Sequence, residues 1–211
     1  MATWIVSSLP ASEPLTRSEI KNYLKIPSAT TADDTLIDDM ITGARQFVER
    51  YTSRALITQT ITEYFDQFPV ASSRNDLLEP RIIKLHIAPV VSITEATGLS
   101  YIASGGTPAA YTDWDNTGNA KYFLDINSGA NGLGPARICK RKGVEWPVIE
   151  EYPNAVKVVY VAGYGAAGSA VPATIKTAMR RIIGTWYFHR KTAQNEWQDV
   201  LDLLSPYRVH K

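Results

Sequence analysis

A glycine-rich segment in the last third of the chain has the spacing G-x-G-x-x-G, which in many proteins cradles the phosphates of a dinucleotide. The glycines are Gly163, Gly165 and Gly168, and they follow an apolar run typical of a strand. In a dinucleotide site the helix begins inside the motif, so that its first N–H groups meet the pyrophosphate. Here Pro172 marks a helix start beyond the motif. The acid that normally follows about 20 residues later is also missing. We interpret this segment as a flexible domain linker.

The other residues that could support catalysis are scattered along the chain. The histidines are His86, His189 and His210, and none has the close His or Cys partner that a metal site requires. Cys139 is the single cysteine, so an intrachain disulfide is impossible. A lone cysteine is more typical of a structural position, although a nucleophile with a spatially adjacent histidine stays an alternative.

Paired carboxylates are the remaining candidates for acid–base chemistry. Adjacent residues on one helix do not face each other, so such pairs fit a solvated helix face better than a catalytic cleft. We therefore expect no enzymatic activity, no cofactor and no metal. The pairs are Asp33/Asp34, Asp38/Asp39 and Glu150/Glu151.

The elements that would position these residues are helical at both ends of the chain. Thr16 and Glu19 have the spacing of a capping box, which predicts a short helix after Thr16. Apolar residues then recur with helical spacing over residues 36–51. Near the other end, Pro172 is typical of a first helical turn, and a final short helix is predicted over residues 194–204.

The middle of the chain has the pattern of an all-β region. β-branched and aromatic residues form several short runs, separated by turn-rich stretches at 98–108 and 127–135. Strands at this spacing predict a small antiparallel sheet, sandwich or barrel. The predicted strands are 57–65, 83–87, 90–94, 121–126, 136–140 and 155–162.

The predicted fold class is therefore α+β, with N- and C-terminal helices packed as one helical bundle and a small antiparallel β domain inserted between them. We expect an extended N-terminal arm at 1–14, a helical core at 15–55 plus 171–205, the inserted β domain at 56–165 and a tail at 206–211. The apolar residues of the arm either pack on their own domain or dock on a neighbouring subunit.

Composition and charge narrow the functional classes. The 211 residues carry a net charge of +1, which indicates no global attraction to nucleic acid or to a membrane. No apolar run approaches the ~18 residues of a membrane span, and the N-terminus lacks the basic region of a signal peptide. We expect a soluble protein made in a cytoplasm.

The charges are nevertheless unevenly distributed. Acids outnumber bases in residues 1–66, whereas residues 152–195 contain no acid and follow a basic cluster at 137–142. Three interpretations stay open: solvated faces, complementary surfaces between subunits, or a basic rim near DNA. A helix turns by about 100° per residue, so Trp186, Tyr187 and Phe188 cannot all face one core. An aromatic residue left on a second face favours an interface.

Five stretches of this chain together resemble the head–tail connector (adaptor) proteins of tailed phages and gene-transfer agents. They include "LTRSEIKNYLKI" near the start, the strand "VVYVAGYG" and the closing "LLSPYR". None of these motifs is specific by itself, and the resemblance rests on their order and spacing. The stretches are Leu15–Ile26, Phe47–Ile57, Val158–Gly165, Val171–Ile175 and Leu203–Arg208.

The resemblance implies a structural protein of the virion neck that is assembled in the host cytoplasm. It implies a homo-oligomeric ring of about twelve copies between the portal protein and a stopper or tail-completion protein, with double-stranded DNA passing through without sequence recognition and no membrane partner. The alternatives are an uncharacterised enzyme with its site in the β insert and a nucleic-acid-binding module.

The candidate residues fall into three groups. The resemblance implies portal docking by Leu203, Leu204, Pro206, Tyr207 and Arg208. We expect Lys140, Arg141 and Lys142 to face the DNA channel or a partner. The charge pattern and the aromatic run make Asp38, Asp39, Arg180, Arg181 and Tyr187 candidates for the contact between subunits.

Overall fold

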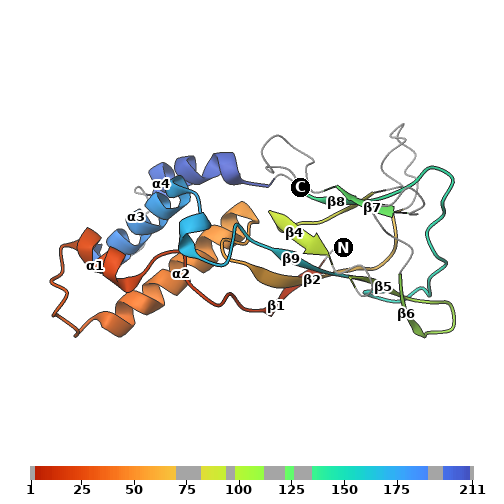
Figure 1. Ribbon diagram of the computed structural model, residues 1–211, viewed down its shortest axis with the longest axis horizontal. Helices are drawn as coiled ribbons and strands as arrows, with labels where there is room; N and C mark the ends of the chain where they lie inside the picture. The colour runs from red at the N-terminus through yellow and green to blue at the C-terminus, as the bar shows by residue number, and fades with distance from the viewer. Residues whose placement is uncertain are drawn as a thin grey trace. The chain divides into compact units, whose positions relative to one another are not determined.

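The computed structural model describes residues 3–69, 82–93, 98–111, 122–125, 135–189 and 197–209. It confirms an α+β fold, with four α-helices and two antiparallel sheets in this part of the chain (Figure 1). Residues 10–58 and 163–209 contribute to a helical unit, and residues 3–9 and 59–162 contribute to a β unit. None of the described helices has the length and apolarity that crossing a membrane requires.

The helical unit takes its elements from both ends of the chain. The α-helices are α1 (Arg17–Leu24), α2 (Asp34–Thr52), α3 (Ala173–His189) and α4 (Trp197–Leu204), and two short 3-10 helices are η3 (Gly168–Ala170) and η4 (Ser205–Tyr207). The described part of the final predicted helix begins at Trp197, and residues 194–196 lie outside the described residues.

Apolar side chains at helical spacing on α2 and α3 form the core of the helical unit. These side chains come from segments more than 120 residues apart, so the front and rear helices stabilise each other. This confirms that helices from both ends pack together. The buried residues are Ile37, Ile41, Ala44 and Val48 of α2, and Ile175, Ala178, Met179, Ile182 and Ile183 of α3.

The predicted capping box is present at the start of α1. The Thr16 backbone N–H donates to Glu19 Oε2 at 2.8 Å, and the Glu19 N–H donates to Thr16 Oγ1 at 3.2 Å. The helix ends at Leu24 because Lys25 adopts a left-handed conformation with φ 61°. The helix therefore ends before Pro27.

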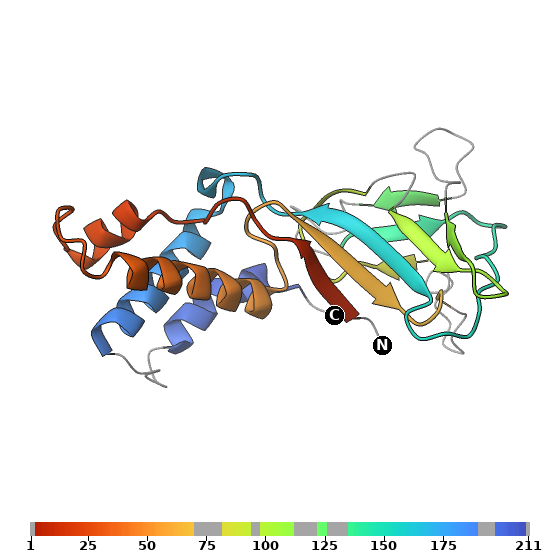
Figure 2. The ribbon, with the colours of Figure 1, turned by 90° about the horizontal axis from the view of Figure 1, so that it is seen from below.

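The β unit contains two antiparallel sheets. The larger has the order β1-β2-β9-β5-β6, with β4 also paired to β9, and the smaller has the order β3-β8-β7 (Figure 2). The strands are β1 (Thr3–Ser8), β2 (Gln59–Phe65), β3 (Ile82–Lys84), β4 (Val90–Ile93), β5 (Leu99–Ile102), β6 (Pro108–Ala110), β7 (Tyr122–Asp125), β8 (Arg137–Lys140) and β9 (Val156–Ala162).

Alternation along β2 and β9 gives the larger sheet one buried face. In the ladder, Ile61 lies opposite Tyr160 and Glu63 lies opposite Val158, and all four side chains are buried. On β9 the neighbours on the other face, such as Val159, are more exposed, whereas Thr62 of β2 on that face is buried as well. This two-residue period fixes the register, because a slip by one residue would exchange the two faces.

Three strands were not predicted from the sequence. β1 lies within the predicted arm and pairs antiparallel with β2. β5 and β6 overlap the stretch predicted as turns, in which Gly105 and Gly106 with positive φ occupy the connection of a hairpin. Residues 94, 121 and 126–134 of the predicted strands and turns lie outside the described residues.

The G-x-G-x-x-G segment is packed rather than loose. The Thr58 N–H donates to the Gly165 carbonyl at 3.0 Å, and the Ser12 hydroxyl donates to the Ala166 carbonyl at 2.8 Å. A Cβ on Gly168 would lie 2.4 Å from the carbonyl oxygen of Pro14. These glycines therefore allow close backbone approach within the helical unit.

We predict that Gly168→Ala lowers the free energy of unfolding of the helical unit by about 1–3 kcal/mol, because the new methyl group must displace backbone. Gly43→Ala is the matched control, since its Cβ would lie 3.4 Å from the Trp186 ring and α2 gains a better helix former. Denaturant titration followed by far-UV circular dichroism measures both. Equal stability of the two variants would contradict this explanation.

Candidate assembly surfaces

The His86 side chain lies beside the carboxylate of Glu63 in the β unit. Glu63 is fully buried on β2, where its Oε1 accepts the His86 backbone N–H at 2.9 Å and lies 3.1 Å from His86 Nδ1. The Tyr160 hydroxyl accepts the Ile87 N–H at 3.2 Å. Burial, together with the Glu63 carboxylate, raises the pKa of Tyr160. This arrangement ties the chain after β3 to the larger sheet.

Cys139 is buried in β8, opposite Ile82 in the smaller sheet. In the part of the chain that the structure describes, no three His, Cys, Asp or Glu side chains gather closely enough to hold a metal ion. Cys139 is therefore part of the packed interior of the smaller sheet.

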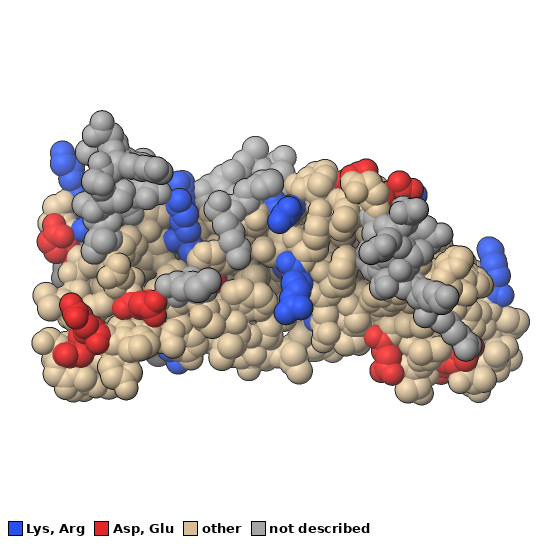
Figure 3. Space-filling model, turned by 180° about the vertical axis from the view of Figure 1, so that it is seen from behind, with Lys and Arg blue, Asp and Glu red and all other residues tan. Residues whose placement is uncertain are grey.

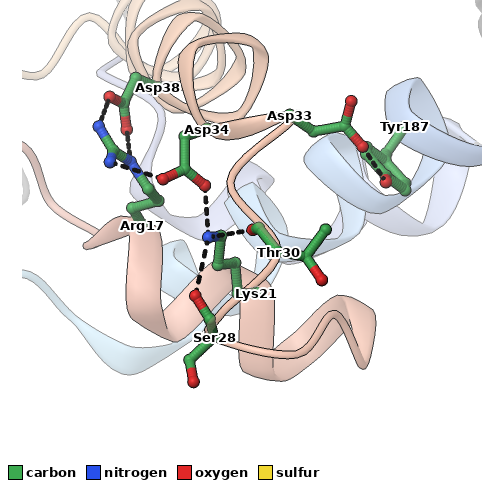
Figure 4. Close-up of polar contacts among 8 residues, drawn as sticks. All are labelled: Arg17, Lys21, Ser28, Thr30, Asp33, Asp34, Asp38 and Tyr187. Carbon is green, nitrogen blue, oxygen red and sulfur yellow. Dashed lines mark hydrogen bonds and ion pairs between the residues drawn. The ribbon is translucent and has the colours of Figure 1, made fainter.

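Two cations of α1 hold the beginning of α2 in place (Figure 4). Arg17 donates from Nη1 to Asp34 Oδ2 at 3.0 Å and from Nε to Asp38 Oδ1 at 2.9 Å. The Lys21 side chain, only 8% exposed, pairs with Asp34 and donates to the Thr30 carbonyl at 2.7 Å. These bonds close the loop between the two helices.

The same contacts stabilise the charged form of the carboxylates. The hydrogen bond from Lys21, aided by the charge of Arg17, lowers the pKa of Asp34. The hydrogen bond from Arg17 lowers the pKa of Asp38 in the same way. Both acids therefore contribute to folding as anions.

Most of the residues predicted to join subunits already have partners inside their own chain. Asp38 binds Arg17, and the Tyr187 hydroxyl donates to Asp33 Oδ2 at 2.7 Å (Figure 4). Arg180 Nη2 lies 3.4 Å from Glu19 Oε1, across α3 and α1. The acidic and basic segments thus attract each other within the helical unit. A role of these residues between subunits stays a prediction.

Asp39 and Arg181 are the more exposed members of that set. Arg181 lines a groove of about 580 Å³ together with Tyr23, Gly184, Phe188 and Asp199. Phe188 is 65% exposed, which places an aromatic ring on the solvent side of α3. The groove and this ring form a surface of the helical unit that could accept another chain.

The C-terminal segment is part of the helical unit. Arg54, 1% exposed, donates from Nε to the Tyr207 carbonyl. The Val209 N–H donates to the Thr52 carbonyl at 2.9 Å, and the Val209 side chain is buried. Nothing in the sequence singles out Arg54 for this role. The segment predicted as a tail is therefore fixed up to Val209, and residues 210–211 lie outside the described residues.

The portal-docking candidates differ in accessibility. Leu204 is fully buried, and Leu203 and Tyr207 are partly buried against the core. Pro206 and Arg208 are exposed, and the Arg208 guanidinium lies 5.4 Å from the centre of the Tyr51 ring. Pro206 and Arg208 are therefore the most accessible members of this set.

The residues of the basic cluster also differ in their exposure to solvent. Lys140 is 7% exposed, and its ammonium donates to the Val144 carbonyl at 2.8 Å and to Glu145 at 3.2 Å. Arg141 and Lys142 are exposed. On the face drawn in Figure 3 the basic side chains are scattered and form no continuous stripe.

Comparisons with known proteins identify the fold. No protein-family model and no curated protein matches the sequence. A chain in the neck of an empty gene transfer agent particle, computed with C6 symmetry, matches with a TM-score of 0.73 and 18% identity over 99% of this chain and 96% of that chain. A chain in the virion of a native particle matches with a TM-score of 0.67 and 19% identity over 99% and 96%. A third chain, in the neck of a native particle computed with C12 symmetry, matches with a TM-score of 0.62 and 20% identity over 98% of this chain and 96% of that chain.

We predict that Asp34→Asn combined with Asp38→Asn flattens the acid dependence of stability. Both acids have a lowered pKa when folded, so their contribution is complete well above the unfolded pKa of about 3.9 and is lost as pH falls below it. The melting temperatures of variant and wild type should differ at pH 7 and converge as the pH falls through the lowered folded pKa values of the two acids. A gap that is constant with pH would contradict this, and Asp39→Asn on the exposed side of α2 is the control.

We predict that Arg54→Ala lowers the free energy of unfolding of the helical unit by about 3–5 kcal/mol, because it leaves a cavity and an unpaired Tyr207 carbonyl. The amide of Val209 should also exchange faster with deuterium. Arg50→Ala removes an exposed arginine from the last turn of α2 and should change stability by less than about 0.5 kcal/mol. Slow Val209 exchange in Arg54→Ala would contradict the anchoring role.

Proposed function

We propose that this chain is a head–tail adaptor, a neck protein of a phage-like particle that forms a ring beneath the portal. In this role it links the capsid to a stopper or tail-completion protein, and packaged DNA passes through the ring. The observation that carries the proposal is the full-length fold likeness to chains in gene transfer agent particles, two of them in particle necks.

The sequence motifs support the proposal independently of the fold. The five stretches that resemble connector proteins lie over α1, at the end of α2 and just after it, in β9, at the start of α3, and at the end of α4 with η4. They therefore coincide with the helical unit and with the strand that leads into it. The C6 and C12 symmetries of the similar necks are consistent with several copies of this chain in a closed ring.

Portal docking is assigned to the exposed end of the C-terminal segment. Arg208 is solvent-exposed but supported by the Tyr51 ring, and Pro206 lies beside it on η4. Truncation after Leu204 would remove Val209 from the core, so it would test folding as much as docking. Substitution of an exposed side chain separates the two.

DNA contact is assigned to Arg141 and Lys142. Both are exposed, whereas Lys140 supports the loop from within. Attraction of two side chains to phosphates is independent of sequence and weakens with salt. This fits DNA that passes a surface rather than DNA that is held by it.

We predict that the purified chain forms rings with the portal protein, visible by native mass spectrometry and negative-stain microscopy. Arg208→Glu should weaken portal binding at least tenfold with little change in melting temperature, because the guanidinium at the docking surface is replaced by an anion. The matched control is Arg50→Glu, which makes the same change at an exposed site on α2. A chain that stays monomeric and does not bind the portal would contradict the proposed function.

A further inference from the structure

The first strand of the β unit is held differently from the others. β1 has the sequence T-W-I-V-S-S, and none of its six side chains is buried. Trp4 is 40% exposed and Ile5 is 50% exposed. The strand therefore contributes little to its own core, and its attachment depends on the backbone ladder with β2 and on the contact between the Ser7 and Thr62 hydroxyls at 2.5 Å.

The position of β1 also has few of the features that normally protect an edge. It is the terminal strand of the larger sheet and pairs with β2 alone among the described strands. Natural edge strands are usually short or carry charges or proline, which discourage pairing between molecules. β1 carries neither a charge nor a proline, and a register shift between Val6 and Ser8 is the one irregularity in its ladder.

A short connection joins β1 to the rest of the chain. Leu9 is 75% exposed, and Pro10 and Ala11 follow it. The chain is fixed again at Ser12, which binds the Ala166 carbonyl, and at Glu13, which accepts Arg45 Nε at 2.8 Å. β1 could thus leave its β2 without removing any buried side chain from either unit.

We propose that in the assembled ring β1 of one copy pairs with β2 of the neighbouring copy. The proposal rests on the proposed function, because it requires repeated copies side by side. The segment that would pair with the neighbour's β2 is β1, because the structure already shows β1 paired with β2 in a specific register within one chain. Exchange of an identical strand keeps every contact and adds a link between subunits.

In a ring, unlike in a free monomer, the β2 edge of a neighbouring copy is close to β1. Neighbouring edges held at high effective concentration make pairing between chains competitive with pairing within a chain. Four steps of extended chain from Ser12 to Ser8 reach at most about 14 Å. The exchange therefore requires that a neighbour's β2 edge lie within that distance of Ser12.

Paired cysteines distinguish the two topologies. Ile5 and Thr62 lie directly opposite each other in the ladder. Opposed Cα atoms in antiparallel strands are about 4.5–5.5 Å apart, which is within the range that a disulfide spans. The full-length Ile5→Cys, Thr62→Cys variant is oxidised as monomer and as ring from gel filtration, and both are run on a non-reducing gel. The proposal expects intrachain links in the monomer and a ladder of linked chains in the ring.

A mixed ring gives the most direct version of this test. When chains with only Ile5→Cys are assembled with chains that carry only Thr62→Cys, a disulfide between positions 5 and 62 can form solely between chains. Each single variant assembled alone reports links at other sites, including Cys139. The out-of-register pair Ile5→Cys, Tyr64→Cys should give at least tenfold less product.

The outcomes separate this proposal from the function on which it rests. Rings whose chains link only internally, or do not link at all, would overturn the strand exchange and leave the adaptor function intact. Failure to form any ring, with or without the portal protein, would overturn both. A ladder in the ring and 5–62 links in the mixed ring would support the exchange.

Discussion

The burial of α2 against α3 is the interaction on which the rest of the molecule depends. A fully buried aliphatic side chain contributes about 1.5–3 kcal/mol, whereas an exposed ion pair contributes about 0–1 kcal/mol. The row from Ile37 to Val48 therefore outweighs the nearby charges in holding the two ends of the chain together. Both ends of the chain belong to the helical unit, so the chain passes out of this unit after Thr58 and re-enters it at Gly163.

The polar contacts orient the helices and leave few groups free for other tasks. Arg17 and Lys21 hold the start of α2, and Arg54 holds the C-terminal segment. Arg17 and Lys21 thus pair with an acid of the same N-terminal segment, and Arg180 pairs with Glu19 across the two ends of the sequence. Among the described residues, the outward-facing features include a groove beside Phe188, the exposed Arg208 and the side chains of β1.

Periodicity predicted most of the fold, because long amphipathic patterns depend on neighbours along the chain. The helices over 36–51 and after Pro172 and the strands around Ile61 and Val158 appear as predicted. β1 was missed because its pairing is decided by β2, more than 50 residues away. The burial of single charged side chains, such as Lys140 and Arg54, could not be predicted from the sequence either, since it depends on tertiary contacts.

The central claim is that this chain serves as a repeated part of a particle neck. A cryo-electron microscopy reconstruction of the neck of particles that contain this protein tests it most directly. The account predicts a closed ring of copies of this fold directly beneath the portal, in which the helical unit of each copy contacts the helical units of the neighbouring copies. A neck that is complete without this chain, or a single copy located elsewhere, would contradict it.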